Sequence, residues 1–110
     1  MKFIKKKICL KFFHDPKTAV NGANVLYTDV WSSMGEENQK EEKDKSFSGF
    51  MIDSNLIKRA DIDAIVLHCL PAYRNKEITD DVIDSKQSRI FQQAENRLHA
   101  QQALLACLLS

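Results

Sequence analysis

A possible amino-acid-binding segment follows an apolar run in the first third of the chain. The segment Asp29–Gly35 reads DVWSSMG and comes directly after a run centred on Val25–Tyr27. Asp29 could pair with a substrate amine, while Ser33 and the backbone N–H groups around Met34 could hold a carboxylate. An acid beside an anion-binding loop suits an α-amino acid. The alternative is that Asp29 caps a helix and the serine, methionine and glycine form a plain turn.

A cysteine lies beside a histidine at the end of a second apolar run. The run Ile65–Leu67 leads into the segment His68–Pro71, which reads HCLP. A thiol at a strand end, beside a histidine and before a bend forced by proline, is a candidate reactive cysteine. The alternatives are that Cys69 is a buried structural residue and that His68 is a hydrogen-bonded structural one.

A third candidate is an arginine near the start of a predicted helix. The segment Glu95–Leu109 is rich in alanine, leucine and glutamine, which favour helix. Arg97 would lie in the first turn, where a positive charge is unfavourable to the helix dipole. We interpret this as a sign that Arg97 points toward an anion or a polar ligand oxygen. The alternative is an ordinary surface arginine.

The elements that must position these residues alternate between strand and helix, which predicts an α/β fold with a parallel sheet. The carboxyl ends of parallel strands share one edge, so Asp29 and Cys69 should meet there. The expected strands are Ile8–Phe13, Asn24–Asp29, Ala64–Leu70 and the weaker Arg89–Phe91. The expected helices are Pro16–Val20, Ser54–Ala60, Thr79–Asp84 and Glu95–Leu109, whereas the polar block Glu36–Ser46 is either an exposed helix or a loop.

Composition sets the wider expectations. A chain of 110 residues has the size of one small domain, and its formal charge of +1 offers no case for nucleic acid or an anionic membrane as partner. No apolar run approaches the ~18 residues that would span a bilayer. The three cysteines are odd in number and show no CxxC or metal-ligand spacing. We therefore expect a cytoplasmic protein without disulfides, metal or cofactor.

Taken in order, these segments resemble the ornithine carbamoyltransferase family. Asp29–Gly35 is similar to its ornithine-binding loop, His68–Pro71 to its HCLP signature, and Glu95–Gln101 to its ENRLHAQ stretch. The resemblance covers about residues 8–109, and related aspartate carbamoyltransferases lack the SMG loop. It implies that residues 1–110 are a partial ornithine-binding domain. The implied fold is a partial Rossmann-like parallel sheet, flanked by helices and followed by a long C-terminal helix.

The resemblance also implies a role for each candidate residue. Asp29 would bind the amine of L-ornithine, and Ser33 and Met34 would hold its α-amino-acid end. Cys69 would lie at the reacting amine and help its deprotonation. Leu70, through its backbone, and Arg97 would contact the carbamoyl group donated by carbamoyl phosphate. The implied products are L-citrulline and phosphate.

Several family motifs do not occur in this sequence. The phosphate-binding Ser-Thr-Arg-Thr loop, the His-Pro-x-Gln segment and an ornithine-binding asparagine are placed upstream by the family and are missing here. We therefore expect the chain to need the missing N-terminal half, to be inactive alone, and to join the family's homotrimers only with that half. The alternatives are a non-catalytic amino-acid-binding or interaction module and an inert remnant of the domain.

The last residues before the C-terminus form an unbroken apolar run. Every residue from 103 to 109 is alanine, leucine or cysteine. A helix resting on one sheet needs only one apolar stripe, and a helix apolar all round needs partners on most sides. We expect this helix end to lack part of its packing in the isolated chain.

Overall fold

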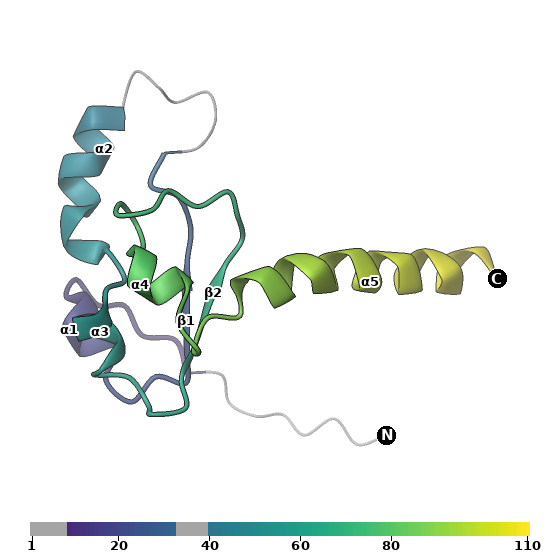
Figure 1. Cartoon of the computed structure of the whole chain (residues 1–110), viewed down its shortest axis with the longest axis horizontal. Coiled ribbons are helices and arrows are strands. Elements are labelled where there is room, and N and C mark those ends of the chain that lie inside the picture. The colour runs from purple at the N-terminus through teal and green to yellow at the C-terminus, as the bar shows by residue number, and fades with distance from the viewer. Residues whose placement is uncertain (1–8, 33–39) are drawn as a thin grey trace.

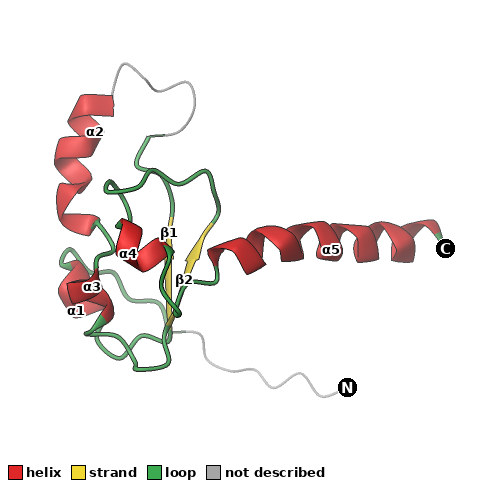
Figure 2. Ribbon diagram, in the orientation of Figure 1, coloured by secondary structure: helices red, strands yellow, loops and turns green. Residues whose placement is uncertain are grey.

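Two short parallel strands form the centre of the fold. In the computed structural model, which describes residues 9–32 and 40–110, strand β1 (Val25–Thr28) pairs with strand β2 (Ile65–His68). Their register aligns Thr28 with His68, so both strands end at the same edge (Figure 1). The predicted α/β class, parallel sheet and flanking helices are confirmed (Figure 2).

The buried core is aliphatic and joins the two strands to the helices beside them. Val66 in β2 and Ile78 in the loop before α4 are completely shielded from solvent. Burial of such side chains stabilises by roughly 1.5–3 kcal/mol each. The buried apolar residues are Leu26, Ile52, Leu56, Ile57, Ala64, Val66, Ile78, Val82, Ile83 and Ile90.

Three short helices flank the sheet. They are α1 (Pro16–Ala19), α3 (Ser54–Ile57) and α4 (Asp80–Ile83), and α3 lies between the two strands in the chain. The carboxylate of Asp15 accepts hydrogen bonds from the first backbone N–H groups of α1, as predicted, and that of Asp53 does the same for α3. Thr79 precedes α4 as expected, but its side chain accepts no capping hydrogen bond.

The polar block that could be helix or loop is helical in its described part. Helix α2 (Lys40–Phe47) runs into a 3-10 turn, η2 (Ser48–Phe50). The Lys76 ammonium lies 2.6 Å from the Asp44 carboxylate and joins α2 to the loop before α4. The Phe47 ring also stacks on Trp31, with centroids 6.5 Å apart. These contacts fix an otherwise polar helix against the body of the domain.

Two predicted strands are wrong. Residues 9–13 form no strand, and Leu10 and Phe12 are 75% and 88% exposed, because no described segment pairs with them. At the other edge, Ser88 makes one isolated bridge to Val66. Helix α5 (Ile90–Leu109) then begins, five residues earlier than predicted. Burial of Ile90 and strong helix formers from Gln92 onward favour this turn into helix over a third strand.

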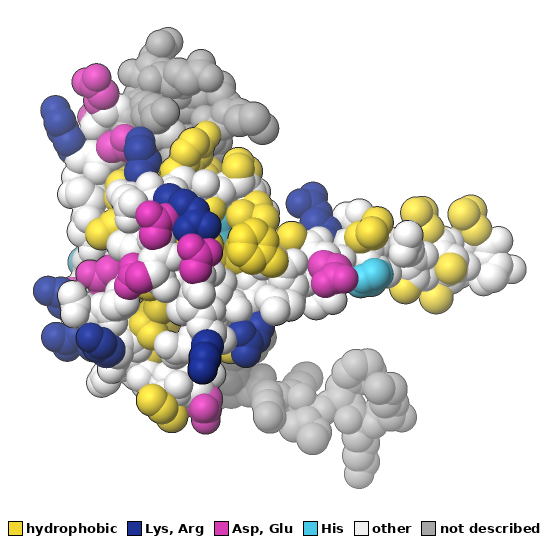
Figure 3. All heavy atoms as spheres, in the orientation of Figure 1, with side chains coloured by type: hydrophobic (Ala, Val, Ile, Leu, Met, Phe, Trp, Pro, Cys, Tyr) yellow, Lys and Arg dark blue, Asp and Glu magenta, His cyan; other side chains and the backbone are white. Residues whose placement is uncertain are grey.

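Helix α5 leaves the rest of the domain and projects outward (Figure 1). Ile90 is its one fully buried residue, and apolar side chains lie on its surface (Figure 3). The prediction of missing packing is confirmed at its far end, where Leu105 is 57% exposed and Leu108 is 71% exposed. Within the described ranges, no helix combines the length and apolar character needed to cross a membrane.

Candidate functional site

The carboxyl ends of the two strands bring together the predicted acid and thiol. Asp29 follows β1 directly, and Cys69 follows β2 directly. The Cys69 sulfur and an Asp29 carboxylate oxygen lie within 4.8 Å of each other, and hydrogen bonding from the thiol is the largest influence on the pKa of Asp29. The expectation that these side chains share one rim of the sheet is confirmed, because parallel strands in this register end side by side.

The two groups shift each other's acidity in opposite directions. The hydrogen bond from Cys69 holds the pKa of Asp29 below its usual value, helped by the Val30 N–H group 2.7 Å away. Burial, followed by the hydrogen bond and negative charge of Asp29, raises the pKa of the Cys69 thiol. The resting site at neutral pH is therefore a carboxylate beside a protonated thiol.

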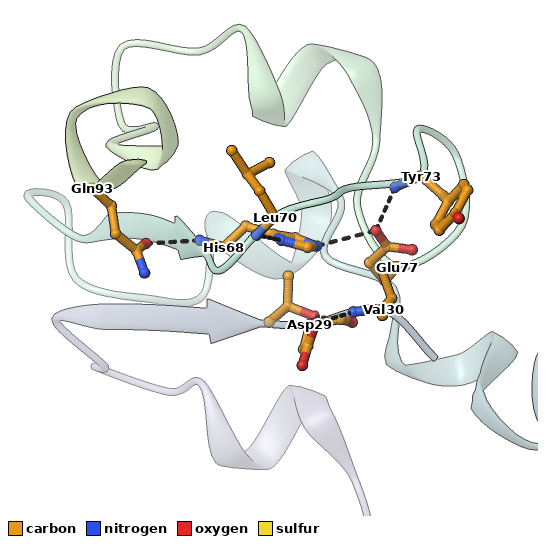
Figure 4. A network of polar contacts seen from close by, with 8 residues as sticks. Asp29, Val30, His68, Leu70, Tyr73, Glu77 and Gln93 are labelled. Carbon is orange, nitrogen blue, oxygen red and sulfur yellow. Dashed lines mark hydrogen bonds and ion pairs between the residues drawn. The ribbon is translucent and has the colours of Figure 1, made fainter. Parts of the chain in front are cut away.

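His68 is a buried structural residue, as its alternative interpretation held. Its Nδ1 accepts a hydrogen bond from the Leu70 N–H group at 2.8 Å, so the ring proton must be on Nε2 (Figure 4). Nε2 then donates to Glu77 Oε1 at 3.1 Å. Although ligand atoms of Asp29, His68 and Cys69 lie within 4.8 Å of one another, the ring has no nitrogen left for a metal ion.

The loop after Cys69 is held in a defined shape by this histidine. Leu70 has a φ angle of 55°, in the left-handed region that residues with side chains rarely adopt, and precedes a cis bond to Pro71. Glu77 Oε1 accepts a second hydrogen bond from the Tyr73 N–H group at 2.6 Å. His68 and Glu77 thus fix the backbone of Leu70, the group expected to contact a carbamoyl ligand.

Arg97 and Cys69 line the same open pocket, of about 720 Å³. Asp29 instead lines a neighbouring apolar pocket, and Tyr27 lines both pockets. The single cleft expected for all the site residues is thus two pockets. The pocket that contains Cys69, called here the Cys69 pocket, is lined by Tyr27, His68, Cys69, Leu70, Pro71, Gln93, Ala94 and Arg97.

Two further predictions need correction or lie outside the described residues. The helix begins at Ile90, so Arg97 is seven residues beyond its start and the argument from a first-turn dipole does not apply. Its place in the pocket is what makes Arg97 a candidate. Ser33 and Met34, the expected carboxylate-binding residues, are not among the described residues.

Sequence reasoning missed Gln93, which links helix α5 to both strands. Its Oε1 accepts a hydrogen bond from the His68 N–H group at 3.1 Å (Figure 4), and its Nε2 donates to the Tyr27 hydroxyl at 3.0 Å. The one available signal was its spacing, because Gln93 is four residues before Arg97 and shares its helix face. That spacing alone does not separate it from an exposed glutamine.

A parallel α/β sheet with a thiol and a carboxylate at its strand ends, and an arginine of α5 in the adjoining pocket, defines a ligand-binding domain of the open-sheet class. Residues 2–108 match the family described as aspartate/ornithine carbamoyltransferase, Asp/Orn binding domain. The chain belongs to the aspartate/ornithine carbamoyltransferase family.

Similar proteins agree with this assignment. The chain is 70% identical to an ornithine carbamoyltransferase of Prochlorococcus marinus subsp. pastoris, across 96% of this chain and 34% of that protein. The ornithine carbamoyltransferase structure from Pyrococcus furiosus is 56% identical, with a TM-score of 0.78 over 84% of this chain and 30% of the other. An anabolic enzyme from Campylobacter jejuni is 47% identical, with a TM-score of 0.80 over 87% and 32%. The chain spans about a third of the length of the curated relatives it matches.

Proposed function

We propose that residues 1–110 are the ornithine-binding part of an ornithine carbamoyltransferase of arginine biosynthesis, acting in the cytoplasm. The enzyme would transfer the carbamoyl group of carbamoyl phosphate to L-ornithine and release L-citrulline and phosphate. The observation that supports this most directly is the hydrogen-bonded pair of Asp29 and Cys69, beside the pocket that Arg97 lines. Those relatives named as ornithine carbamoyltransferases support the same substrate.

The pair of Asp29 and Cys69 suits an incoming ammonium group. The side-chain ammonium of ornithine resembles that of lysine, with a pKa of about 10.4, and must lose a proton before it can attack. Its positive charge beside Asp29 offsets the carboxylate charge that keeps Cys69 protonated. Cys69 can then lose its proton to solvent, and the resulting thiolate accepts one proton from the ammonium, which leaves a free amine and a neutral thiol. Ser33 and Met34 would hold the α-amino-acid end.

Arg97 and the Leu70 backbone would act on the carbamoyl group. The free amine forms a bond to the carbonyl carbon, the bond from that carbon to the phosphate oxygen breaks, and phosphate leaves. Arg97, in the pocket shared with Cys69, would stabilise the negative oxygen that develops. The Leu70 carbonyl, fixed through His68, would accept from the carbamoyl amide. The part of the enzyme that this chain does not contain would hold most of the phosphate and complete a homotrimer.

A chimera tests this proposal. This chain would replace the matching third of the Prochlorococcus marinus enzyme, which is 70% identical over that stretch. We expect the chimera to form citrulline and the chain alone to form none, because positioning of both substrates supplies much of the rate. Cys69→Ala and Arg97→Met should lower kcat/KM by about tenfold or more, while Asp63→Asn, at the opposite end of β2, should not. An inactive but folded trimeric chimera would contradict the proposal.

A non-catalytic amino-acid-binding module is the second candidate. It is favoured by the pair of Asp29 and Cys69, because this candidate amine-binding pair lies wholly within the described chain. Calorimetric titration of the chain with L-ornithine separates the two candidates. Binding by the chain together with an inactive chimera would favour the module over the enzyme.

A further inference from the structure

We propose that Tyr27 is a positioning residue for Cys69, held by Gln93 so that its hydroxyl group donates a hydrogen bond to the cysteine sulfur. The inference rests on the proposed function, since it concerns how Cys69 handles the proton of the substrate amine. The three segments that carry the resemblance, at residues 29–35, 68–71 and 95–101, do not include either residue. Their assignment comes from the hydrogen bonds that join β1, β2 and α5.

The strand register places Tyr27 on the same face as Cys69. Tyr27 pairs with Leu67, and Cys69 follows two residues later. Side chains alternate along a strand, so residues two apart share a face. Both Tyr27 and Cys69 accordingly line the pocket that contains Arg97.

Gln93 determines which way the Tyr27 hydroxyl proton can point. The backbone N–H of His68 must meet an acceptor, so the amide oxygen of Gln93 faces it, 3.1 Å away. The amide nitrogen of Gln93 therefore faces Tyr27 and donates to its hydroxyl oxygen at 3.0 Å. A hydroxyl has one proton, and with the amide as donor, that proton remains for another acceptor. Tyr27 and Cys69 line the same pocket, and the Tyr27 hydroxyl lowers the pKa of the Cys69 thiol, so the cysteine sulfur is the acceptor inferred for that proton.

The groups facing Cys69 act against one another. The Asp29 carboxylate favours the protonated thiol, whereas the Tyr27 hydroxyl favours the thiolate. Arg97, on α5, lines the same pocket. Both ring nitrogens of His68 are already engaged with Leu70 and Glu77. Tyr27 is thus the neutral donor that opposes the carboxylate without competing for a cationic substrate.

The test measures how fast iodoacetamide alkylates Cys69 between pH 7 and 10, by mass spectrometry of the full chain. A Cys9→Ser, Cys107→Ser background removes the two exposed thiols. Tyr27→Phe should slow alkylation at pH 8 by about three- to tenfold and move its midpoint to higher pH, because a hydrogen bond to the thiolate is lost. Gln93→Leu should act in the same direction. Tyr73→Phe and Gln92→Leu are the matched controls, and we expect no change in either.

The direction of the change separates positioning from a merely structural role. Burial raises the pKa of Cys69, so a variant that only loosens the site should bring alkylation closer to that of a free thiol and make it faster. An unchanged or faster rate in Tyr27→Phe would overturn the inference. A slower rate together with an inactive chimera would sink the proposed enzyme function and leave the contact between Tyr27 and Cys69 established.

Discussion

Asp29 and Cys69 influence each other's protonation at the ends of the two strands. The hydrogen bond between them favours the carboxylate and the thiol together, so a change to either group alters the other. Tyr27, which accepts a hydrogen bond from Gln93, lowers the pKa of the same thiol. We therefore expect the reactivity of Cys69 to depend on three neighbouring side chains, those of Asp29, Tyr27 and Gln93.

Removal of the Asp29 charge should make Cys69 more reactive. In Asp29→Asn the carboxylate no longer raises the pKa of the thiol, so the thiolate fraction at pH 8 increases and alkylation becomes faster. This direction is opposite to that of Tyr27→Phe, although both residues contact the same sulfur. Alkylation kinetics across pH 7–10 check it, with Asp63→Asn as the control for loss of a carboxylate. Slower alkylation in Asp29→Asn would contradict the electrostatic account.

At the scale of elements, the loop between β2 and α4 is organised by two buried polar side chains. His68 and Glu77 are each 1% exposed, and together they satisfy the N–H groups of Leu70 and Tyr73. Arg74, farther along this loop, is occupied by Asp80 and Asp84, each at 2.8 Å. The backbone of the HCLP segment is thus held in shape by His68, which lines the Cys69 pocket, and by Glu77, which does not.

Loss of the Glu77 acceptor should destabilise this loop. Glu77→Leu leaves the His68 Nε2–H and Tyr73 N–H groups without their shared acceptor, at a cost of about 1–3 kcal/mol in the free energy of unfolding. Glu77→Gln retains a carbonyl oxygen in that place and should cost less. Urea unfolding followed by circular dichroism measures both variants. Equal stability of Glu77→Leu and the unmodified chain would show that the hydrogen bonds contribute nothing net.

At the scale of the whole molecule, helix α5 is the element with the least packing. It projects from the domain, and its large apolar side chains beyond Ile90 are more than half exposed (Figure 3). Exposed aliphatic surface of this kind favours association with another protein surface. In the proposed enzyme, that surface would be supplied by the part of the protein outside this chain.

Polar substitutions on this helix should reduce self-association without loss of stability. Leu105 and Leu108 are 57% and 71% exposed, so Leu105→Gln with Leu108→Gln removes little internal packing. Sedimentation velocity should show the unmodified chain associating and the double variant shifted toward monomer. Gln101→Asn, on the same helix, is the control. A stable monomer for the unmodified chain, together with weaker folding of the double variant, would show that the helix packs internally.

The sequence by itself determined the local features of this protein. Apolar runs predicted β1 and β2, Asp15 and Pro16 predicted α1, and the segments at Asp29 and Cys69 indicated both the family and the residues at the rim. These features depend on neighbours along the chain, such as side-chain periodicity and capping, which a sequence displays directly.

Tertiary structure alone decided how those segments are used. Whether residues 9–13 or 89–91 become strands depends on pairing with another strand. No described strand pairs with residues 9–13, and beside the second segment one isolated bridge joins Ser88 to Val66 before α5 begins. Arg97 lines the Cys69 pocket because α5 begins at Ile90 and passes beside the end of β2. The contact of Gln93 with Tyr27 joins residues 66 positions apart. Such contacts form only when the strands and helix pack together, so no local pattern could have predicted them.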